Sequence, residues 1–194
     1  MKKVKKVCLK FKKALPWYVI TGPPSSGKTT LINELSKLGY LTYPEAARVI
    51  IDREMARGKS IEEIRKNEAE FQKKVFRMNV EIERAAPKDK IVFFDRAIPD
   101  SIAYYQLYGL DPKEVFDACK KIRYKKVFFL EPLPFVKDYA RIENGKAVEK
   151  LTNLLKESYK KLGYKIVTIP AMPVKERLNK ILKEIKSNQN ELID

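Results

Sequence analysis

A turn bounded by two glycines near the start of the chain carries the clearest chemical signal. The run Gly22-Pro-Pro-Ser-Ser-Gly27-Lys28-Thr29 matches the pattern Gly-x-x-x-x-Gly-Lys-Ser/Thr without a gap. The glycines permit backbone angles at which successive N–H groups point into one concavity, as a polyphosphate requires. Lys28 can reach the terminal phosphates, and the Thr29 hydroxyl can bind Mg²⁺. The sequence therefore predicts a site for Mg²⁺ and a nucleoside triphosphate, formed by Gly22, Pro23, Pro24, Ser25, Ser26, Gly27, Lys28, Thr29 and Thr30.

Charged residues follow two of the apolar runs downstream of this loop. Glu45 and Arg48 come after the second run and share one face of a helix start. Asp95 and Arg96 come directly after the third run. Ligands of open α/β sheets bind at the carboxyl ends of the strands, so we expect these side chains to lie near the phosphate loop. The candidate contacts to a substrate are Glu45, Arg48, Arg96 and Asp100.

Each of the main candidates has a catalytic and a structural interpretation. Glu45 is expected to act as a general base or to bind a substrate hydroxyl, and the alternative is that it complements its helix dipole. Asp95 is expected to hold a water on Mg²⁺, and Arg96 to face the transferred phosphoryl group. The alternative for this second pair is a structural ion pair at a strand end.

Composition narrows the chemistry that is possible. The 194 residues, 44% of them apolar, suffice for one domain with its own core. The absence of histidine excludes histidine bases, serine triads and His-ligated zinc. Cys8 and Cys119 are too few for a disulfide framework, and no apolar run is long enough for a membrane span or a secretory signal. We expect a cytoplasmic protein without a transmembrane segment, which uses carboxylates, Lys, Arg, hydroxyls and a bound metal.

The chain is strongly basic, with a net charge of +16. Seven lysines fall within residues 1–13, and subtracting their charges leaves +9 on the remainder. We expect residues 1–15 to form a basic arm ahead of a single domain over residues 16–194. Such a surface attracts nucleotides, nucleic acid or an acidic membrane surface, and the alternative is a solvated, lysine-rich surface.

The phosphate loop lies between an apolar strand and an amphipathic helix, and this alternation continues along the chain. Apolar runs predict buried strands over residues 17–21, 41–43, 91–94, 126–130 and 165–169. Helical spacing predicts helices over residues 28–38, 45–57, 61–85 (one helix or two), 147–161 and 173–187, with another after Pro99. Strands that alternate with helices predict an α/β fold whose parallel sheet is covered on both faces.

Two of these segments resemble known kinases. The stretch from Asp95 to Tyr104 resembles the Asp-Arg-aromatic segment of thymidylate kinases, although Ala97 replaces the usual aromatic residue. Glu45 lies where deoxynucleoside kinases carry a catalytic glutamate, although Pro44 precedes it here instead of following it. From Trp17 onward, the chain is most similar to small predicted ATPases labelled AAA-domain, which are related to nicotinamide riboside kinase. The shared segments are residues 44–48, 93–96, Pro99-Asp100 and Arg123-Tyr124.

This resemblance implies a three-layer P-loop NTPase fold of the nucleoside and nucleotide kinase type, with a five-stranded parallel sheet ordered 2-3-1-4-5. Despite the family label, the chain is too short for a ring-forming motor with a helical lid domain. The resemblance also implies that residues 132–146 form a lid that carries arginines. Arg141 is expected to meet the γ-phosphate when the lid closes, and the alternative is a solvated surface residue.

Three functions are compatible with these features. The preferred one is a kinase that moves the γ-phosphoryl group of ATP or GTP to a nucleoside- or riboside-like hydroxyl, with Lys28 and Arg96 offsetting the transferred charge. The second is an NTP-dependent switch, an ATPase or GTPase whose basic arm docks on nucleic acid or acidic lipid. The third is an NTPase that acts on nucleic-acid ends or bases, for which we find no recognition signature.

Overall fold

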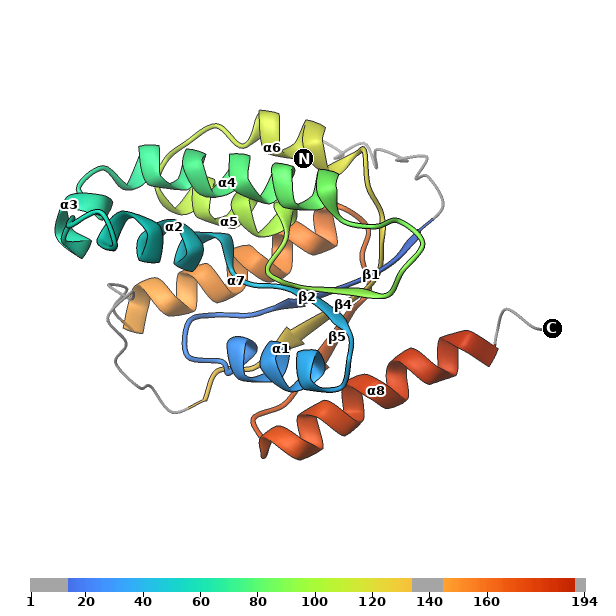
Figure 1. The fold of residues 1–194 in the computed structure, drawn as a ribbon. Coiled ribbons are helices and arrows are strands. Elements are labelled where there is room, and N and C mark those ends of the chain that lie inside the picture. Colours follow the sequence, from blue (N-terminus) through green and yellow to red (C-terminus); the bar gives the residue numbers. More distant parts are fainter. Residues whose placement is uncertain (1–13, 134–144, 191–194) are drawn as a thin grey trace.

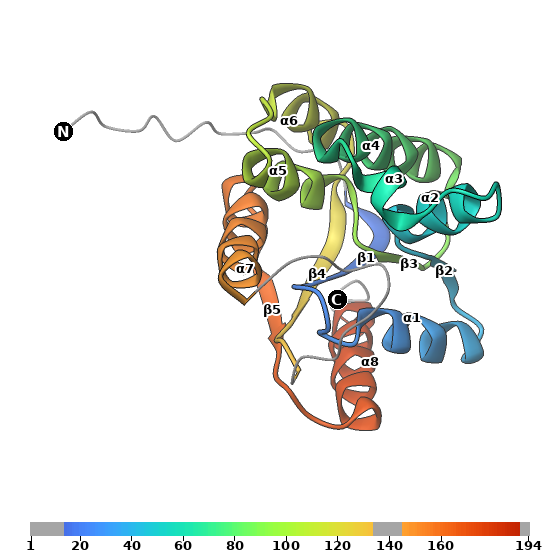
Figure 2. The same ribbon diagram turned by 90° about the vertical axis from the view of Figure 1, so that its left-hand side faces the viewer.

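The computed structural model describes residues 14–133 and 145–190, which form a five-stranded sheet between two layers of helices (Figures 1 and 2). Across the sheet, the order is β2-β3-β1-β4-β5, and every neighbouring pair of strands is parallel. The strands are β1 (Leu15–Thr21), β2 (Leu41–Tyr43), β3 (Val92–Asp95), β4 (Tyr124–Leu130) and β5 (Ile166–Ile169). The expected α/β class and the expected strand order 2-3-1-4-5 are confirmed.

Helices cover both faces of this sheet (Figure 2). One face carries α1 (Lys28–Lys37) and α8 (Val174–Asn190). The other face carries α4 (Glu68–Ala85), α5 (Ile98–Leu107), α6 (Lys113–Cys119) and α7 (Gly145–Lys161). Two more helices, α2 (Ala46–Met55) and α3 (Ile61–Arg65), pack against α4 beyond the end of β2. Within the described ranges, no helix has both the length and the apolar character needed to cross a membrane.

The central strand β1 explains why the apolar runs of this sequence are continuous instead of alternating. Trp17 and Val19 pack in the cluster that holds α4 to α7, whereas Tyr18 and Ile20 pack in the cluster that holds α1 and α8. All four side chains are at most 1% exposed. Because both faces of a parallel sheet are buried, successive residues of its strands must all be apolar. This burial fixes β1 rigidly, and the phosphate loop follows at its carboxyl end.

The structure departs from the sequence-based elements in a few places. Helix α6 was not predicted, because it has only seven residues, of which three are charged and only Val115 and Cys119 are buried. A short helix of this kind is stabilised by packing and not by its own propensity. The segment 61–85, expected to be one helix or two, forms two, since the Asn67 side chain accepts a hydrogen bond from Glu70 N and caps the start of α4. Strands β1 and β4 each begin two residues earlier than predicted.

The basic arm and the lid remain predictions. Residues 1–13 and 134–144, and with them Arg141, lie outside the described residues. Helix α7 begins at Gly145, so the last two residues of the expected lid segment 132–146 are helical.

A buried carboxyl group joins α4, α5 and β4 on the face of the sheet that α4 to α7 cover. Glu83 on α4 is 1% exposed, and it accepts hydrogen bonds from Ile98 N (2.8 Å) and from the Tyr124 hydroxyl (2.7 Å). Burial raises the pKa of Glu83 to about 8, even though both hydrogen bonds favour the ionised form. Glu83 therefore holds the start of α5 against α4 and β4, and it keeps its proton at neutral pH.

Replacing Glu83 by glutamine is expected to weaken the dependence of stability on pH. The unfolded carboxyl ionises near pH 4.5, while the folded one keeps its proton to about pH 8. Between these values the folded state binds more protons, so the wild-type free energy of unfolding falls as pH rises. Urea unfolding should show a loss of stability between pH 5 and pH 8 that is larger in the wild type than in Glu83→Gln by more than about 2 kcal/mol. Glu81→Gln, on the exposed face of the same helix, should behave as wild type; equal losses in all three proteins would contradict the prediction.

Candidate functional site

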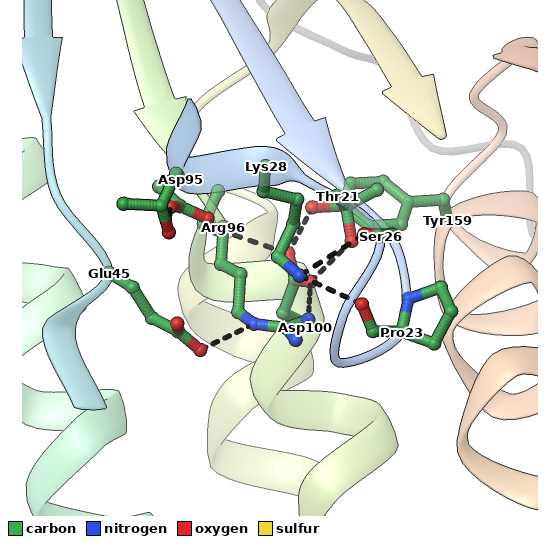
Figure 3. A network of polar contacts seen from close by, with 11 residues as sticks. Thr21, Pro23, Ser26, Lys28, Glu45, Asp95, Arg96, Asp100 and Tyr159 are labelled. Atoms are coloured by element: carbon green, nitrogen blue, oxygen red, sulfur yellow. Dashed lines mark hydrogen bonds and ion pairs between the residues drawn. The ribbon is translucent and has the colours of Figure 1, made fainter. Parts of the chain in front are cut away.

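The phosphate loop connects β1 to α1 at the carboxyl edge of the sheet (Figure 3). Its backbone takes positive φ angles at Gly22 (144°), Ser25 (59°) and Gly27 (81°), and Gly27 is the N-cap of α1. These angles curl the loop around a concavity in front of the helix N-terminus, where backbone N–H groups and the helix dipole favour an anion. The two glycines thus occupy positions whose backbone angles other residues rarely adopt.

Gly22 also lies against the end of a neighbouring strand. A Cβ atom built at Gly22 would meet the carbonyl oxygen of Leu130 in β4 at 2.4 Å, and the Ser26 hydroxyl at 3.1 Å. The carbonyl belongs to the backbone of a central strand and cannot swing away. The first glycine of the motif therefore lets the loop leave β1 directly beside β4.

Replacing Gly22 by alanine is expected to displace the phosphate loop. The new methyl group adds a collision with Leu130 O to the strain of a positive φ, so the free energy of unfolding should fall by at least about 3 kcal/mol. Gly39→Ala is the matched control, because Gly39 has a φ of 87° but nothing within 4 Å of the added atom. The control should lose only about 1 kcal/mol in the same urea titration. Equal losses would show that the close approach has no energetic consequence.

Lys28 is folded back onto this loop. It is only 4% exposed, and its Nζ donates hydrogen bonds to the Pro23 carbonyl (2.9 Å) and to the Ser26 hydroxyl (3.4 Å). The ammonium group therefore lies over the loop concavity, as Figure 3 shows. A cation held there by carbonyl and hydroxyl oxygens can exchange them for phosphate oxygens at small cost in desolvation.

A hydroxyl and a carboxylate beside the loop form a candidate magnesium site. Thr29 Oγ1 donates to Asp95 Oδ2 over 2.9 Å, which joins the start of α1 to the end of β3. Asp95 is 1% exposed, and its other oxygen, Oδ1, is buried without a hydrogen-bond partner. Burial and the nearby negative charge of Glu45 raise the pKa of Asp95 to about 6. Among the described residues no cluster of three acidic or cysteine side chains gathers around a possible ion.

This donor set fits Mg²⁺. The ion prefers oxygen ligands and binds through one or two protein groups, with water and phosphate oxygens completing its octahedron. An unpartnered carboxylate oxygen next to a threonine hydroxyl offers such a position, beside the loop that would hold the phosphates.

Arg96 links the two predicted charged clusters. It has a φ of 66°, which turns its side chain from the end of β3 toward α2 and α5. Its Nε donates to Glu45 Oε1 (2.8 Å) and its Nη1 to Asp100 Oδ1 (3.2 Å) (Figure 3). The guanidinium also lies over the Tyr104 ring, 5.3 Å from its centroid. The sequence placed Glu45 and Arg96 at separate strand ends, and the structure brings them into contact.

Glu45 is held in its ionised form. It is the residue before α2, and its side chain is 20% exposed. Burial alone would raise the pKa of Glu45, but the positive charges of Arg96, Lys28 and Arg48 hold it below its usual value. Glu45 is therefore a carboxylate at neutral pH, which can accept a hydrogen bond from a hydroxyl group.

Asp100 has a different environment from the one expected of a substrate ligand. Its Oδ1 accepts from the Thr21 hydroxyl (2.5 Å) as well as from Arg96, and its Oδ2 accepts from Ala97 N (3.0 Å) and from the Tyr159 hydroxyl. The side chain is 2% exposed. Four protein donors occupy its two oxygens, so Asp100 fixes Arg96 against β1 and α7, and its side chain also lines the pocket described next.

A pocket opens next to these groups, between α2, α4 and α5. Five of the predicted site residues line it, namely Lys28, Glu45, Arg48, Arg96 and Asp100. The remaining lining includes residues that the sequence analysis did not single out, namely Ile51, Arg65, Phe71, Gln72, Val75, Asn79, Ser101 and Tyr104. The pocket therefore extends from the phosphate loop to a mixed apolar and polar wall.

Two amides on α4 are the most informative of these additional residues. Gln72 and Asn79 are seven residues apart, which places them two turns apart on one helix face. They are 3% and 6% exposed, and they lie on the buried side of α4 beside Phe71 and Val75. Asn79 makes no side-chain hydrogen bond to any described residue, and the Gln72 amide nitrogen makes a long one, 3.5 Å, to Glu68. The available signal in the sequence was two polar residues within the apolar stripe of the helix.

Comparison with known proteins identifies the family. Residues 17–177 match the model of a family described as an AAA domain. The chain belongs to this AAA-domain family. This confirms the resemblance found in the sequence, and the match runs from Trp17 within β1 to Arg177 in the first turn of α8. A comparison with curated proteins found no match.

Solved structures similar to this AAA-domain protein include two that are named as kinases. Deoxyadenosine kinase from M. mycoides, with products dCMP and dCDP bound, has a TM-score of 0.61 at 17% identity over 88% of this chain and 98% of that one. Thymidylate kinase from Ehrlichia chaffeensis has a TM-score of 0.64 at 15% identity, covering 89% and 99% of the two chains. NadR in complex with NR has a TM-score of 0.58 at 19% identity, and the match covers 78% of this chain but 43% of NadR. At such identities these likenesses establish the fold.

Proposed function

We propose that this protein is a phosphotransferase that moves the γ-phosphoryl group of Mg·ATP or Mg·GTP to a hydroxyl of a small nucleoside- or riboside-like acceptor. The observation that carries the proposal is the continuity of the pocket. Lys28 of the phosphate loop and the Glu45–Arg96 pair line the same cavity. A donor phosphate and an acceptor hydroxyl bound there would therefore meet between these three side chains.

The chemistry needs positioning and charge compensation more than it needs a strong base. The loop N–H groups and Lys28 bind the phosphates, and Arg96 faces the group in transfer. Thr29 and Asp95 hold Mg²⁺, which neutralises phosphate charge when bound. Arg96 is buried and locked between Glu45 and Asp100, so its position costs no reorganisation during the reaction.

Glu45 is the acceptor-side residue of this mechanism. Its carboxylate accepts a hydrogen bond from the acceptor hydroxyl and aims the oxygen at the γ-phosphorus. Because the pKa of Glu45 is lowered, the hydroxyl keeps its proton until the bond to phosphorus is well advanced. A loose transition state of phosphoryl transfer tolerates this, since the entering oxygen carries little charge early on.

The far wall of the pocket suits a planar, polar head group. Gln72 and Asn79 can each offer an amide donor and an acceptor, while Phe71 offers aromatic surface. A nucleobase or a carboxamide-bearing ring has the matching edges and faces. The similar structures include kinases named for deoxyadenosine and thymidylate, and a protein solved with NR, which agrees with an acceptor of this class.

The test is a screen of nucleosides, ribosides and nucleoside monophosphates with Mg·ATP or Mg·GTP, with detection of phosphorylated product. At saturating donor, Glu45→Gln is expected to lower kcat by about a hundredfold, because its amide cannot accept the proton of the hydroxyl. Glu70→Gln, an exposed residue at the start of α4, is the control and should keep the wild-type rate. If inorganic phosphate is the only product with every acceptor, the kinase proposal fails.

A further inference from the structure

A buried arginine lies beneath the phosphate loop, and the mechanism described above does not use it. Arg177, in the first turn of α8, is 1% exposed. Its Nε donates to the carbonyl of Pro170 (2.9 Å), its Nη2 to the carbonyl of Glu131 (3.2 Å) and its Nη1 to the carbonyl of Ser26. One guanidinium thus holds three backbone segments that are far apart in the sequence.

The three segments are those that surround the donor side of the site. Ser26 belongs to the phosphate loop, Glu131 follows β4, and Pro170 follows β5. The same junction is tied by hydrogen bonds from Glu131 N to Ile169 O (3.0 Å) and from Leu133 N to Ser25 O (3.4 Å). Arg177 therefore lies at the point where the loops of three adjacent strands meet.

The charge of Arg177 has no ion-pair partner in the part of the chain that the structure describes. Burial lowers the pKa of Arg177, with some compensation from the charge of Glu131, but a guanidinium remains charged under all ordinary conditions. A buried cation that is solvated by carbonyl groups alone is costly unless an anion binds nearby. The phosphate loop next to it is the place where an anion would bind.

The bond to Ser26 has a geometric consequence. In a trans peptide unit, the C=O and the following N–H point in opposite directions. Because the Ser26 carbonyl is turned toward Arg177, the N–H of Gly27 is turned away from it, into the concavity of the loop. Arg177 Nη1 also lies 3.4 Å from the place that a Cβ on Gly27 would take, so the guanidinium is packed directly against this peptide.

We propose that Arg177 is a positioning residue of the donor site, which fixes the Ser26–Gly27 peptide so that its N–H points at the bound triphosphate. It does so while joining the phosphate loop to the segments after β4 and β5. This inference rests on the proposed binding of a Mg-nucleoside triphosphate by the loop, and it adds a residue that the loop motif does not contain.

The test compares Arg177→Lys and Arg177→Met with a matched control, Arg123→Lys. Arg123 also donates to two backbone carbonyls, those of Leu162 and Gly163 (2.8 Å each), but it precedes β4 at the opposite edge of the sheet. Calorimetry well below the unfolding temperature measures the Kd of Mg·ATP, Mg·GTP and Mg-tripolyphosphate, which lacks a base. Thermal unfolding of each variant without ligand reports the structural cost separately.

Arg177→Lys keeps the charge but cannot hold three carbonyls, and it is expected to weaken the binding of the nucleotides and of tripolyphosphate about tenfold. Arg177→Met is expected to weaken it about a hundredfold, and Arg123→Lys not at all, whatever its unfolding temperature. Arg177 variants that bind all three ligands as the control does would overturn the inference. So would a loss confined to the nucleotides, because the effect would then come from the base and not from the loop. Absence of binding by the wild-type protein would instead reject the proposed function.

Discussion

Replacing Lys28 by methionine is expected to lower kcat/KM for the phosphotransfer reaction by roughly a thousandfold or more. The Nζ atom lies over the phosphate loop, 2.9 Å from the Pro23 carbonyl, in a side chain that is 4% exposed. A cation in so dry a site interacts with the developing charge far more strongly than it would in water. Methionine keeps the apolar stem and removes the charge, so packing is preserved while the phosphates lose their counter-charge.

The control for this variant is Lys37→Met, at the other end of α1. Lys37 is exposed and pairs with Glu34 over 2.7 Å, a surface contact of small energetic value. Calorimetry with Mg·ATP and Mg·GTP, together with a product assay, should show wild-type behaviour for Lys37→Met and strongly reduced binding and turnover for Lys28→Met. A Lys28 variant that binds and turns over nucleotide as the control does would reject the role given to the whole loop.

The phosphate loop and the sheet were predictable because they depend on local sequence. The apolar run of β1, the loop with Gly22 and Gly27 and the helix that starts at Lys28 follow one another directly in the chain. One short segment therefore specifies the whole phosphate-binding loop. The strand ends that carry Glu45 and Asp95 were predictable for a related reason. In a parallel sheet every carboxyl end lies at the same edge, so order along the chain already determines where these residues gather.

What the sequence could not show are the contacts between distant segments. Asp100 was expected to touch a substrate, and the sequence did not show that donors from β1 and α7, 79 and 59 residues away in sequence, already bind its oxygens. The role of Arg177 was not predictable, because its partner in the loop, the backbone carbonyl of Ser26, lies 151 residues away in sequence. A backbone carbonyl leaves no sequence pattern. Helix α6 is too short for its spacing of Val115 and Cys119 to stand out, and both residues are buried by packing in the cluster that holds α4, α5 and α7. In each case a long-range neighbour decides the role of the residue.

Removing the carboxylate beside Thr29 is expected to have opposite effects on stability and on function. Asp95→Asn should lower kcat/KM by roughly a thousandfold, because a neutral amide is a poor ligand for Mg²⁺ and leaves the phosphate charge uncompensated. Without magnesium and nucleotide, the same variant should be more stable than wild type at pH 7. The wild-type carboxyl is 1% exposed with one oxygen unpartnered, and its burial is unfavourable in the ionised form.

The pH dependence separates these two effects. An unfolded aspartate ionises near pH 3.8, whereas burial and Glu45 raise the pKa of folded Asp95 to about 6. Between these values the folded protein without metal binds more protons than the unfolded chain, so its free energy of unfolding falls as pH rises, by up to about 3 kcal/mol. Asp95→Asn should lack this fall.

Magnesium binding must displace the proton of Asp95, so the affinity of the wild-type protein for Mg·ATP should drop below about pH 6. If Asp95→Asn is less stable than wild type at pH 7 and still binds Mg·ATP equally well, Asp95 is a structural ion-pair residue and the magnesium site lies elsewhere.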